Sequence, residues 1–93
     1  KLTQFWGQSV IKFCQAHSIA LKQIRAVGMH GHTICHSPGG GCPYSWQIGK
    51  PYELASILQL PIVYDFRSAD IALGGQGAPL LPIFHHKLFQ KYI

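Results

Sequence analysis

An apolar run followed directly by a polar, glycine-rich loop constrains this chain most. Pro61-Ile62-Val63-Tyr64 is rich in β-branched and aromatic residues and is bounded by turn residues, which predicts a buried β-strand. The segment that follows, DFRSADIALGGQGAPLLP, runs from Asp65 to Pro82. Open α/β sheets bind their ligands at the carboxyl ends of strands. We therefore expect Asp65 to lie at such an edge, at the start of a ligand-binding loop.

The residue types of this loop suit a polar ligand. The glycines of Gly74-Gly75-Gln76-Gly77 can adopt positive φ and allow a ligand to approach the backbone, and Pro79 and Pro82 stiffen the exit. Asp and Arg side chains can bind several hydroxyls of a ligand, or its carboxylate.

A structural interpretation of the same segment stands beside the functional one. Asp65 is suited to cap a helical segment over residues 66–73, and Arg67 is suited to pair with Asp70 one helical turn away. Both interpretations remain open on the sequence alone.

The other elements follow from hydrophobic periodicity, and their order is typical of an α/β protein. We expect a first helix over Leu2 to His17, whose buried face carries Leu2, Phe5, Trp6, Val10, Phe13 and Cys14. We expect strands over Ile24 to Met29 and, half-exposed, over Pro43 to Gly49, with a turn over Ser37 to Gly41 and an ambiguous segment over Ile34 to His36. Two further helices are expected, one from Gly49 or Lys50 to about Gln59 and one over Phe84 to Ile93. His30 and Thr33 would then lie at the same sheet edge as Asp65, lining one cleft.

Composition narrows the class of protein. The chain has 93 residues, of which 47% are apolar and only 12% are charged. Soluble domains usually carry about a quarter charged residues, so we expect a piece whose apolar faces are covered by other structure, or an oligomer. The net charge of +5 comes from scattered cations, and we expect no dedicated nucleic-acid binding.

Compartment and membrane expectations follow from the same residues. Three cysteines cannot all pair within one chain, which favours a reducing compartment and hence the cytoplasm. No apolar run approaches the length of a transmembrane helix, and no signal peptide is evident, so we expect no membrane association.

The histidine and cysteine cluster raises the alternative of a small metal-binding protein. His30, His32, Cys35, His36 and Cys42 fall close together, but their spacing matches no common zinc-ligand pair, and we expect no metal site. A cysteine nucleophile is not indicated either, because the sequence identifies no group that would orient a base for it. A phosphate-binding Gly-rich loop of P-loop or dinucleotide type is also missing.

Four collinear motifs carry a family resemblance. They are Met29-His30-Gly31-His32-Thr33, Gln47-Ile48-Gly49, Asp65-Phe66-Arg67 followed by Asp70, and Gly74-Gly75-Gln76-Gly77-Ala78-Pro79-Leu80. Over about residues 24–89 the chain resembles the anhydro-N-acetylmuramic acid kinases.

The resemblance implies a ribonuclease H-like α/β domain of the actin, Hsp70 and sugar-kinase superfamily. It implies conversion of 1,6-anhydro-N-acetylmuramic acid to N-acetylmuramic acid 6-phosphate with ATP and Mg²⁺, during peptidoglycan recycling, by a cytoplasmic homodimer. The chain would be part of the N-terminal domain, with the phosphate loop and the catalytic Asp motif outside it, and would be inactive alone.

By matched position, the resemblance implies a substrate-binding set and no catalytic residue within this chain. The set is His30, Asp65, Arg67, Asp70, Gln76 and Gln47. Arg67 and Gln76 would hold the lactyl carboxylate or the N-acetyl group, and Asp65 would accept hydrogen bonds from sugar hydroxyls.

The sequence departs from the family pattern at three places. His32 stands where many members have Gln, Lys50 where Asp or Asn is usual, and Ser68-Ala69 where many have two arginines. A non-catalytic sugar- or metabolite-binding module remains the alternative in another class.

Overall fold

The computed structural model describes all residues from Lys1 to Ile93, and they divide into two compact units. Unit 1 comprises Lys1–Ile34 and Gln47–Asp65, and unit 2 comprises Cys35–Trp46 and Phe66–Ile93. The chain mixes helices and strands, which confirms the α/β class. No helix combines the length and the apolar character needed to cross a membrane.

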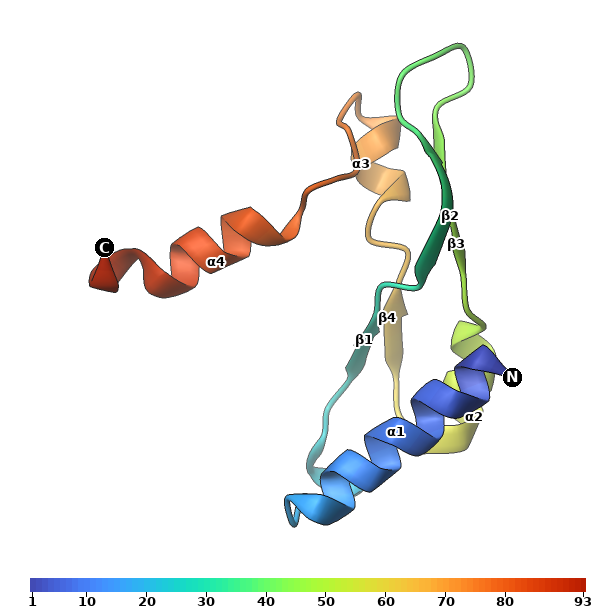
Figure 1. Cartoon of the computed structure of the whole chain (residues 1–93), viewed down its shortest axis with the longest axis vertical. Coiled ribbons are helices and arrows are strands. Elements are labelled where there is room, and N and C mark those ends of the chain that lie inside the picture. The colour runs from blue at the N-terminus through green and yellow to red at the C-terminus, as the bar shows by residue number, and fades with distance from the viewer. The chain divides into compact units, whose positions relative to one another are not determined.

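Unit 1 contains a parallel strand pair packed with two helices. Its elements are α1 (Leu2–Ala16), the 3₁₀ helix η1 (Leu21–Gln23), β1 (Val27–Met29), α2 (Pro51–Leu58) and β4 (Ile62–Tyr64) (Figure 1). β1 pairs with β4 in parallel, with Val27 opposite Ile62 and Met29 opposite Tyr64. The strand predicted over Ile24 to Met29 therefore exists, but it is shorter at its start.

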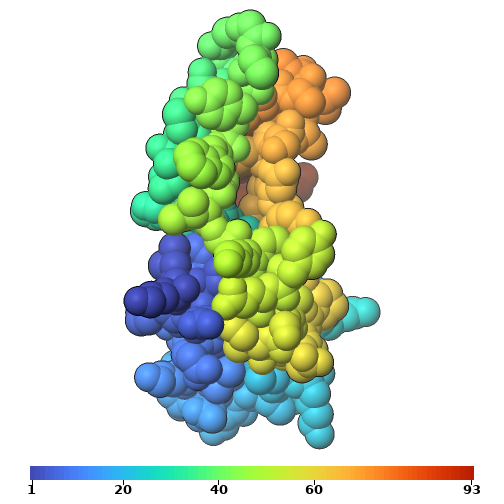
Figure 2. Space-filling model, turned by 90° about the vertical axis from the view of Figure 1, so that its right-hand side faces the viewer, coloured from blue at the N-terminus to red at the C-terminus, as the bar shows by residue number.

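The core of unit 1 lies where α2 packs against α1 and the strands. Met29, Leu54 and Leu58 are buried, and their apolar neighbours are partly buried, namely Trp6, Val10, Ile11, Val27, Ile57, Leu60 and Ile62. α1 and α2 contact each other along their lengths (Figure 2). Leu54 and Leu58, both 2% exposed, are the most fully buried apolar side chains of this unit, and their burial stabilises it.

The buried face of α1 differs from the predicted one. Thr3, Gly7 and Cys14 are its buried residues, whereas Leu2, Phe5 and Phe13 are 39%, 68% and 58% exposed, so placing these three on the buried face was wrong. The reason is the close approach of α2: a Cβ on Gly7 would lie 2.8 Å from Ile57 Cγ2. A helix can pack this closely only on a side that carries a glycine, and the contact face is centred there.

Thr3 also ties the start of α2 to α1. Its Oγ1 accepts a hydrogen bond of 2.9 Å from the backbone N–H of Lys50, the residue that precedes α2. Lys50 itself provides no side-chain cap. Pro51 occupies the first turn of the helix, and Gln59 ends it in the left-handed conformation with φ of 55°.

β4 is not the buried strand that the sequence predicted. Val63 is 53% exposed and Tyr64 is 44% exposed, and β4 has a single neighbouring strand. Apolar runs of this kind are typical of parallel strands covered on both faces.

β2 (His32–Ser37) and β3 (Tyr44–Ile48) form a second two-stranded sheet, joined by a glycine-rich turn. The segment left ambiguous over Ile34 to His36 is therefore part of a strand, and the strand predicted over Pro43 to Gly49 is confirmed with slightly closer ends. Residues up to Ile34 and from Gln47 belong to unit 1, and Cys35–Trp46 belong to unit 2.

Unit 2 further contains α3 (Ser68–Ala72), α4 (Leu81–Phe89) and the 3₁₀ helix η2 (Gln90–Tyr92). Ile71 is its one buried apolar residue. α4 begins earlier than the predicted Phe84, because Pro82 fits the first turn of a helix, and none of its residues is buried. Its apolar side chains are exposed, as the low charge content of the chain led us to expect.

Candidate functional site at the strand ends and the glycine loop

Two of the predicted residues lie side by side at the carboxyl end of the parallel strand pair. His30 directly follows Met29, Asp65 directly follows Tyr64, and Met29 and Tyr64 are paired in the register. Both His30 and Asp65 are exposed. The predicted edge is thus confirmed for His30 and Asp65, which place an imidazole and a carboxylate at one end of the sheet in unit 1. The prediction that Thr33 lies at the same edge is wrong, because Thr33 belongs to β2 of the second sheet.

The backbone turns sharply after each strand. Asp65 has φ of 56°, and Gly31 has φ of 72°. A Cβ on Gly31 would lie 2.8 Å from Gln47 Cβ, so the turn after β1 passes close against Gln47 because residue 31 has no side chain. Thr33 Oγ1 donates a hydrogen bond of 2.7 Å to Gln47 Oε1, which orients the predicted amide in the same unit.

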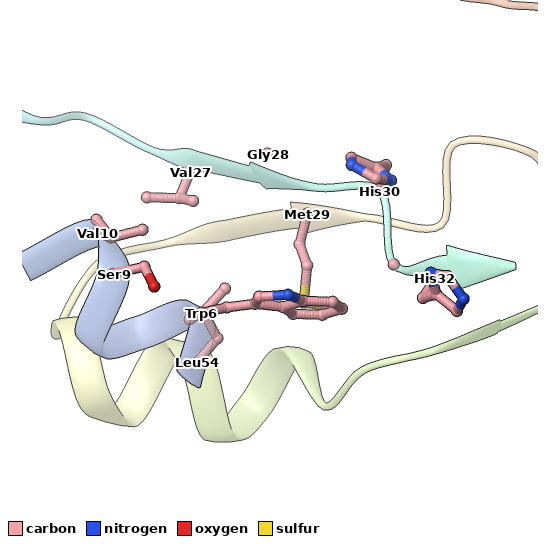
Figure 3. A pocket seen from close by; sticks show the side chains of 10 residues that line it. Trp6, Ser9, Val10, Val27, Gly28, Met29, His30, His32 and Leu54 are labelled. Carbon is pink, nitrogen blue, oxygen red and sulfur yellow. The ribbon is translucent and has the colours of Figure 1, made fainter. Parts of the chain in front are cut away.

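A pocket of about 420 Å³ lies along β1 in unit 1 (Figure 3). Its floor is apolar, and Figure 3 shows the His30 and His32 imidazoles toward the carboxyl end of the strand, with the Ser9 hydroxyl near Val10 on α1. The lining residues are Trp6, Ser9, Val10, Val27, Gly28, Met29, His30, Gly31, His32 and Leu54. The sequence did not indicate that Trp6 and Ser9 belong to this lining, since helical periodicity gives the buried face but not the neighbouring strand.

Gly49 explains how the Gln47-Ile48-Gly49 motif fits against this pocket. Its φ is 134°, and a Cβ there would lie 2.8 Å from Trp6 Cζ3 and 3.3 Å from Met29 Cε. Figure 3 shows the Trp6 ring and the Met29 side chain next to each other below the strand. A glycine at this position therefore lets the chain leave β3 over the indole ring.

In unit 2, Arg67 and Asp70 both contact the glycine loop. Arg67 Nη1 donates to the carbonyl oxygen of Gly77 at 2.6 Å, and Asp70 Oδ2 accepts from the N–H of Gly77 at 2.8 Å. Arg67 stands at the N-cap position of α3, and its own side chain makes no capping bond. The predicted positive φ values are confirmed at Gly74 (92°) and Gly77 (70°).

Gln76 is exposed between two anchored glycines. The N–H of Gly75 donates to the backbone carbonyl of Asp70 at 2.8 Å, and Gly77 is bonded by both side chains described above. Gly77 is buried, and a Cβ there would lie 2.8 Å from Ile71 Cδ1. The glycine motif was recognised in the sequence, but nothing there indicated that Gly77 is the residue to which Arg67 and Asp70 both bond.

The predicted set is thus divided between the units. His30, Gln47 and Asp65 belong to unit 1, whereas Arg67, Asp70 and Gln76 belong to unit 2. Within each unit the predicted residues lie in adjoining segments.

The histidines and cysteines do not form a metal centre. No group of three or more His, Cys, Asp or Glu side chains is placed to hold a metal ion. Instead the cluster makes pairwise contacts in the hairpin of unit 2: Cys35 Sγ lies 3.0 Å from Tyr44 Oη, and His36 Nδ1 lies 2.9 Å from Ser45 Oγ. The hydrogen bond with Cys35 raises the pKa of Tyr44, with smaller contributions from the charges of Cys35 and Cys42.

The chain is thus an α/β segment in which each unit carries exposed polar side chains, at the strand ends in unit 1 and in the glycine loop in unit 2, and its glycines do not have the spacing of a P-loop or a dinucleotide-binding loop. The sequence matches the family profile described as "Anhydro-N-acetylmuramic acid kinase" over residues 1–92. This chain belongs to that family.

Curated relatives named anhydro-N-acetylmuramic acid kinase agree with the match. The chain is 43% identical to one from Sulfurimonas denitrificans and 46% identical to one from Pasteurella multocida, in both cases over 98% of this chain. It is 51% identical to one from Pseudomonas syringae over 89% of this chain. The matched regions are 25%, 24% and 22% of these relatives, so the chain spans about a quarter of their length.

Proposed function

We propose that these residues form part of the N-terminal domain of an ATP-dependent kinase that acts on 1,6-anhydro-N-acetylmuramic acid. The enzyme opens the anhydro bridge with water, transfers a phosphoryl group to the 6-oxygen, and yields N-acetylmuramic acid 6-phosphate for peptidoglycan recycling. Residues 1–93 supply part of the sugar-binding side. The observation that carries the proposal is the family match over residues 1–92.

The remaining properties of the whole protein are part of the same proposal. Its domain is of the ribonuclease H-like kind found in actin, Hsp70 and sugar kinases, and the parallel pairing of β1 with β4 supports this assignment. Two parallel strands do not make a stable sheet by themselves, so further strands of the longer polypeptide would complete it. The full protein is a cytoplasmic homodimer with an amino-sugar substrate, and binds neither nucleic acid nor membrane.

ATP and Mg²⁺ are held outside these residues. The glycines of this chain do not follow the spacing of a phosphate loop, and its carboxylates do not cluster for a metal ion, so we assign the phosphate loop and the catalytic Asp motif to other parts of the polypeptide. When bound, ATP supplies the phosphoryl group. The residues described here bind and orient the sugar, and the isolated chain is expected to be inactive.

In unit 1 the proposed sugar ligands are His30, Asp65 and Gln47. The Asp65 carboxylate accepts hydrogen bonds from sugar hydroxyls, and the His30 imidazole and Gln47 amide can each donate and accept. Their role is orientation, because opening a strained acetal depends on positioning the reacting groups and on stabilising charge. Arg67, Asp70 and Gln76 are the proposed sugar-binding residues of unit 2.

The proposal is tested with the full-length protein by measuring ADP release and by following the phosphorylated sugar with ³¹P NMR. Asp65→Asn keeps the side-chain size but removes the charge, and we expect a rise in KM for the anhydro sugar of about tenfold, equivalent to about 1.4 kcal/mol of lost charge-assisted hydrogen bonding. Glu53→Gln is the matched control, because Glu53 is the other carboxylate of unit 1 and lies in the first turn of α2. We expect no change in KM for that variant.

Two outcomes would contradict the proposal. If the full-length protein binds the anhydro sugar but releases no ADP, the chain belongs to a binding module without kinase activity. If Asp65→Asn turns over with unchanged KM, the strand-end carboxylate is not a sugar ligand.

A further inference from the structure

We propose that Arg67 and Asp70 are positioning residues that fix the backbone on both sides of Gly77, so that Gln76 is the side chain of this loop that contacts the sugar. This inference rests on the proposed function and revises its assignment of direct contacts in unit 2. It is argued from contacts within unit 2 alone.

The first argument is how the two side chains are used. Asp70 Oδ2 binds the N–H of the peptide between Gln76 and Gly77, and Arg67 Nη1 binds the carbonyl of the peptide between Gly77 and Ala78. The donor and the acceptor of Gly77 are therefore both satisfied by charged side chains, and bonds of this kind are stronger than neutral ones. The separation of three residues between Arg67 and Asp70 places them on one side of α3, facing the same glycine.

The second argument is the space around the Asp70 carboxylate. Asp70 Oδ2 lies so close to Gly75 that a Cβ there would overlap it, and the Gly75 N–H bonds to the Asp70 carbonyl. Backbone and side chain of Asp70 thus hold the glycines on either side of Gln76. One oxygen of this carboxylate, Oδ2, is therefore already bonded within the loop when no ligand is present.

The third argument is the state of Gln76 itself. Gln76 is exposed, whereas Gly77 is buried and Gly75, Arg67 and Asp70 are partly buried. An amide side chain between two anchored glycines can donate and accept while its backbone is held in place. Such pre-organisation lowers the cost of ordering the side chain on binding, and this is the contribution that we assign to Arg67 and Asp70.

The experiment is a double-mutant cycle in the full-length protein, with KM for the anhydro sugar, kcat and thermal stability measured for each variant. Gln76→Ala and Asp70→Ala should each raise KM by about tenfold, and the double variant should be no worse than the poorer single variant, because Asp70 acts through Gln76. Asp70→Asn should recover most of the lost affinity, since its amide oxygen can still accept from the Gly77 N–H.

Gly75→Ala provides an independent test that removes no polar group. The added methyl group displaces the Asp70 carboxylate, so its effect on KM should match that of Asp70→Ala, and hydrogen exchange at the Gly77 amide should become faster in both variants. Leu73→Ala, at a side chain that is 90% exposed beside the same loop, is the control and should change neither quantity.

The outcomes separate this inference from the proposed function. Additive effects of Asp70→Ala and Gln76→Ala on KM, in an active enzyme, would overturn the positioning role and favour direct contact by Asp70. Unchanged Gly77 exchange in the Asp70→Ala variant would overturn it as well, even if activity falls. A wild-type protein that does not phosphorylate the sugar refutes the proposed function, while the exchange measurement still tests the contacts.

Discussion

Unit 1 and unit 2 are ordered by different interactions. In unit 1, Met29, Leu54 and Leu58 form a buried cluster to which α1, α2 and the strands contribute. In unit 2, Ile71 is the one buried apolar side chain, and the loop after α3 is held at Gly77, whose carbonyl accepts a hydrogen bond from Arg67 and whose N–H donates one to Asp70. Apolar burial thus places the strand ends, whereas charged side chains bonded to the backbone shape the glycine loop.

This difference has a physical basis in what each region has to provide. A sheet edge is positioned well enough by packing, because the strand register fixes where His30 and Asp65 emerge. A glycine-rich loop has no side chains to pack and loses much conformational entropy on ordering, so it needs specific directional bonds. A mutation near the sugar-binding residues proposed in unit 1 is therefore expected to disturb packing, whereas one near those proposed in unit 2 is expected to disturb hydrogen bonds to the loop backbone.

The largest expected effect tests whether apolar packing stabilises unit 1. Leu54→Ala removes a side chain that is 2% exposed, and we expect the free energy of unfolding to fall by about 3 kcal/mol from lost burial and the remaining cavity. Denaturant-induced unfolding of the full-length protein measures it. Tyr52→Ala, at a residue of the same helix that is 80% exposed, is the control, and an equal loss there would contradict the packing argument.

A smaller effect is expected from the glycine that anchors the polar loop. Gly77→Ala places a Cβ at φ of 70° and 2.8 Å from Ile71 Cδ1, which we expect to cost about 2 kcal/mol in stability and to raise KM for the sugar. The matched control is Gly39→Ala, because a Cβ on Gly39 meets nothing within 4 Å. Equal tolerance of the two substitutions would show that the loop is not held as described.

The smallest expected effect concerns a tyrosine pair beside the strand end. A hydrogen bond of 3.5 Å to Tyr52 raises the pKa of Tyr64 above its ordinary value of 10.0, with the charge of Asp65 contributing least. The folded protein then holds this phenolic proton more tightly than the unfolded chain, so the contribution to stability is full below pH 10.0 and is lost as pH rises through the raised pKa. Tyr52→Phe should shift the Tyr64 titration, followed by absorbance near 295 nm, toward lower pH.

The outcome of that titration sharpens the comparison. An unchanged midpoint in Tyr52→Phe would mean that the hydroxyl pair does not set the proton affinity of Tyr64. The corresponding pair in unit 2 is Tyr44 with Cys35, where a hydrogen bond also raises the tyrosine pKa.

Much of the architecture could be predicted from local sequence signals. Pro51 and Gln59 bound α2 almost as expected, and the apolar run before Asp65 correctly predicted a strand end beside His30. These features depend on propensity and turn chemistry within a few residues, which a single sequence records.

What the sequence did not predict depends on contacts between distant segments. Helical periodicity does not mark Gly7 as a contact point, yet α2 approaches α1 at this residue, beside Ile57, and Phe5 remains exposed. Likewise, Arg67 and Asp70 were predicted to bind the substrate, but their hydrogen bonds with Gly77 depend on the path of the loop. Periodicity and motif spacing carry no information on such pairings.

The contact between Gly7 and Ile57 sets a rule for anyone who redesigns this chain. The side chains at positions 7 and 57 share one space, so a library that varies position 7 alone will return glycine. A library that varies both positions can also return alanine at position 7 together with an aliphatic residue smaller than isoleucine at position 57. The two positions should therefore be randomised together and selected as one unit.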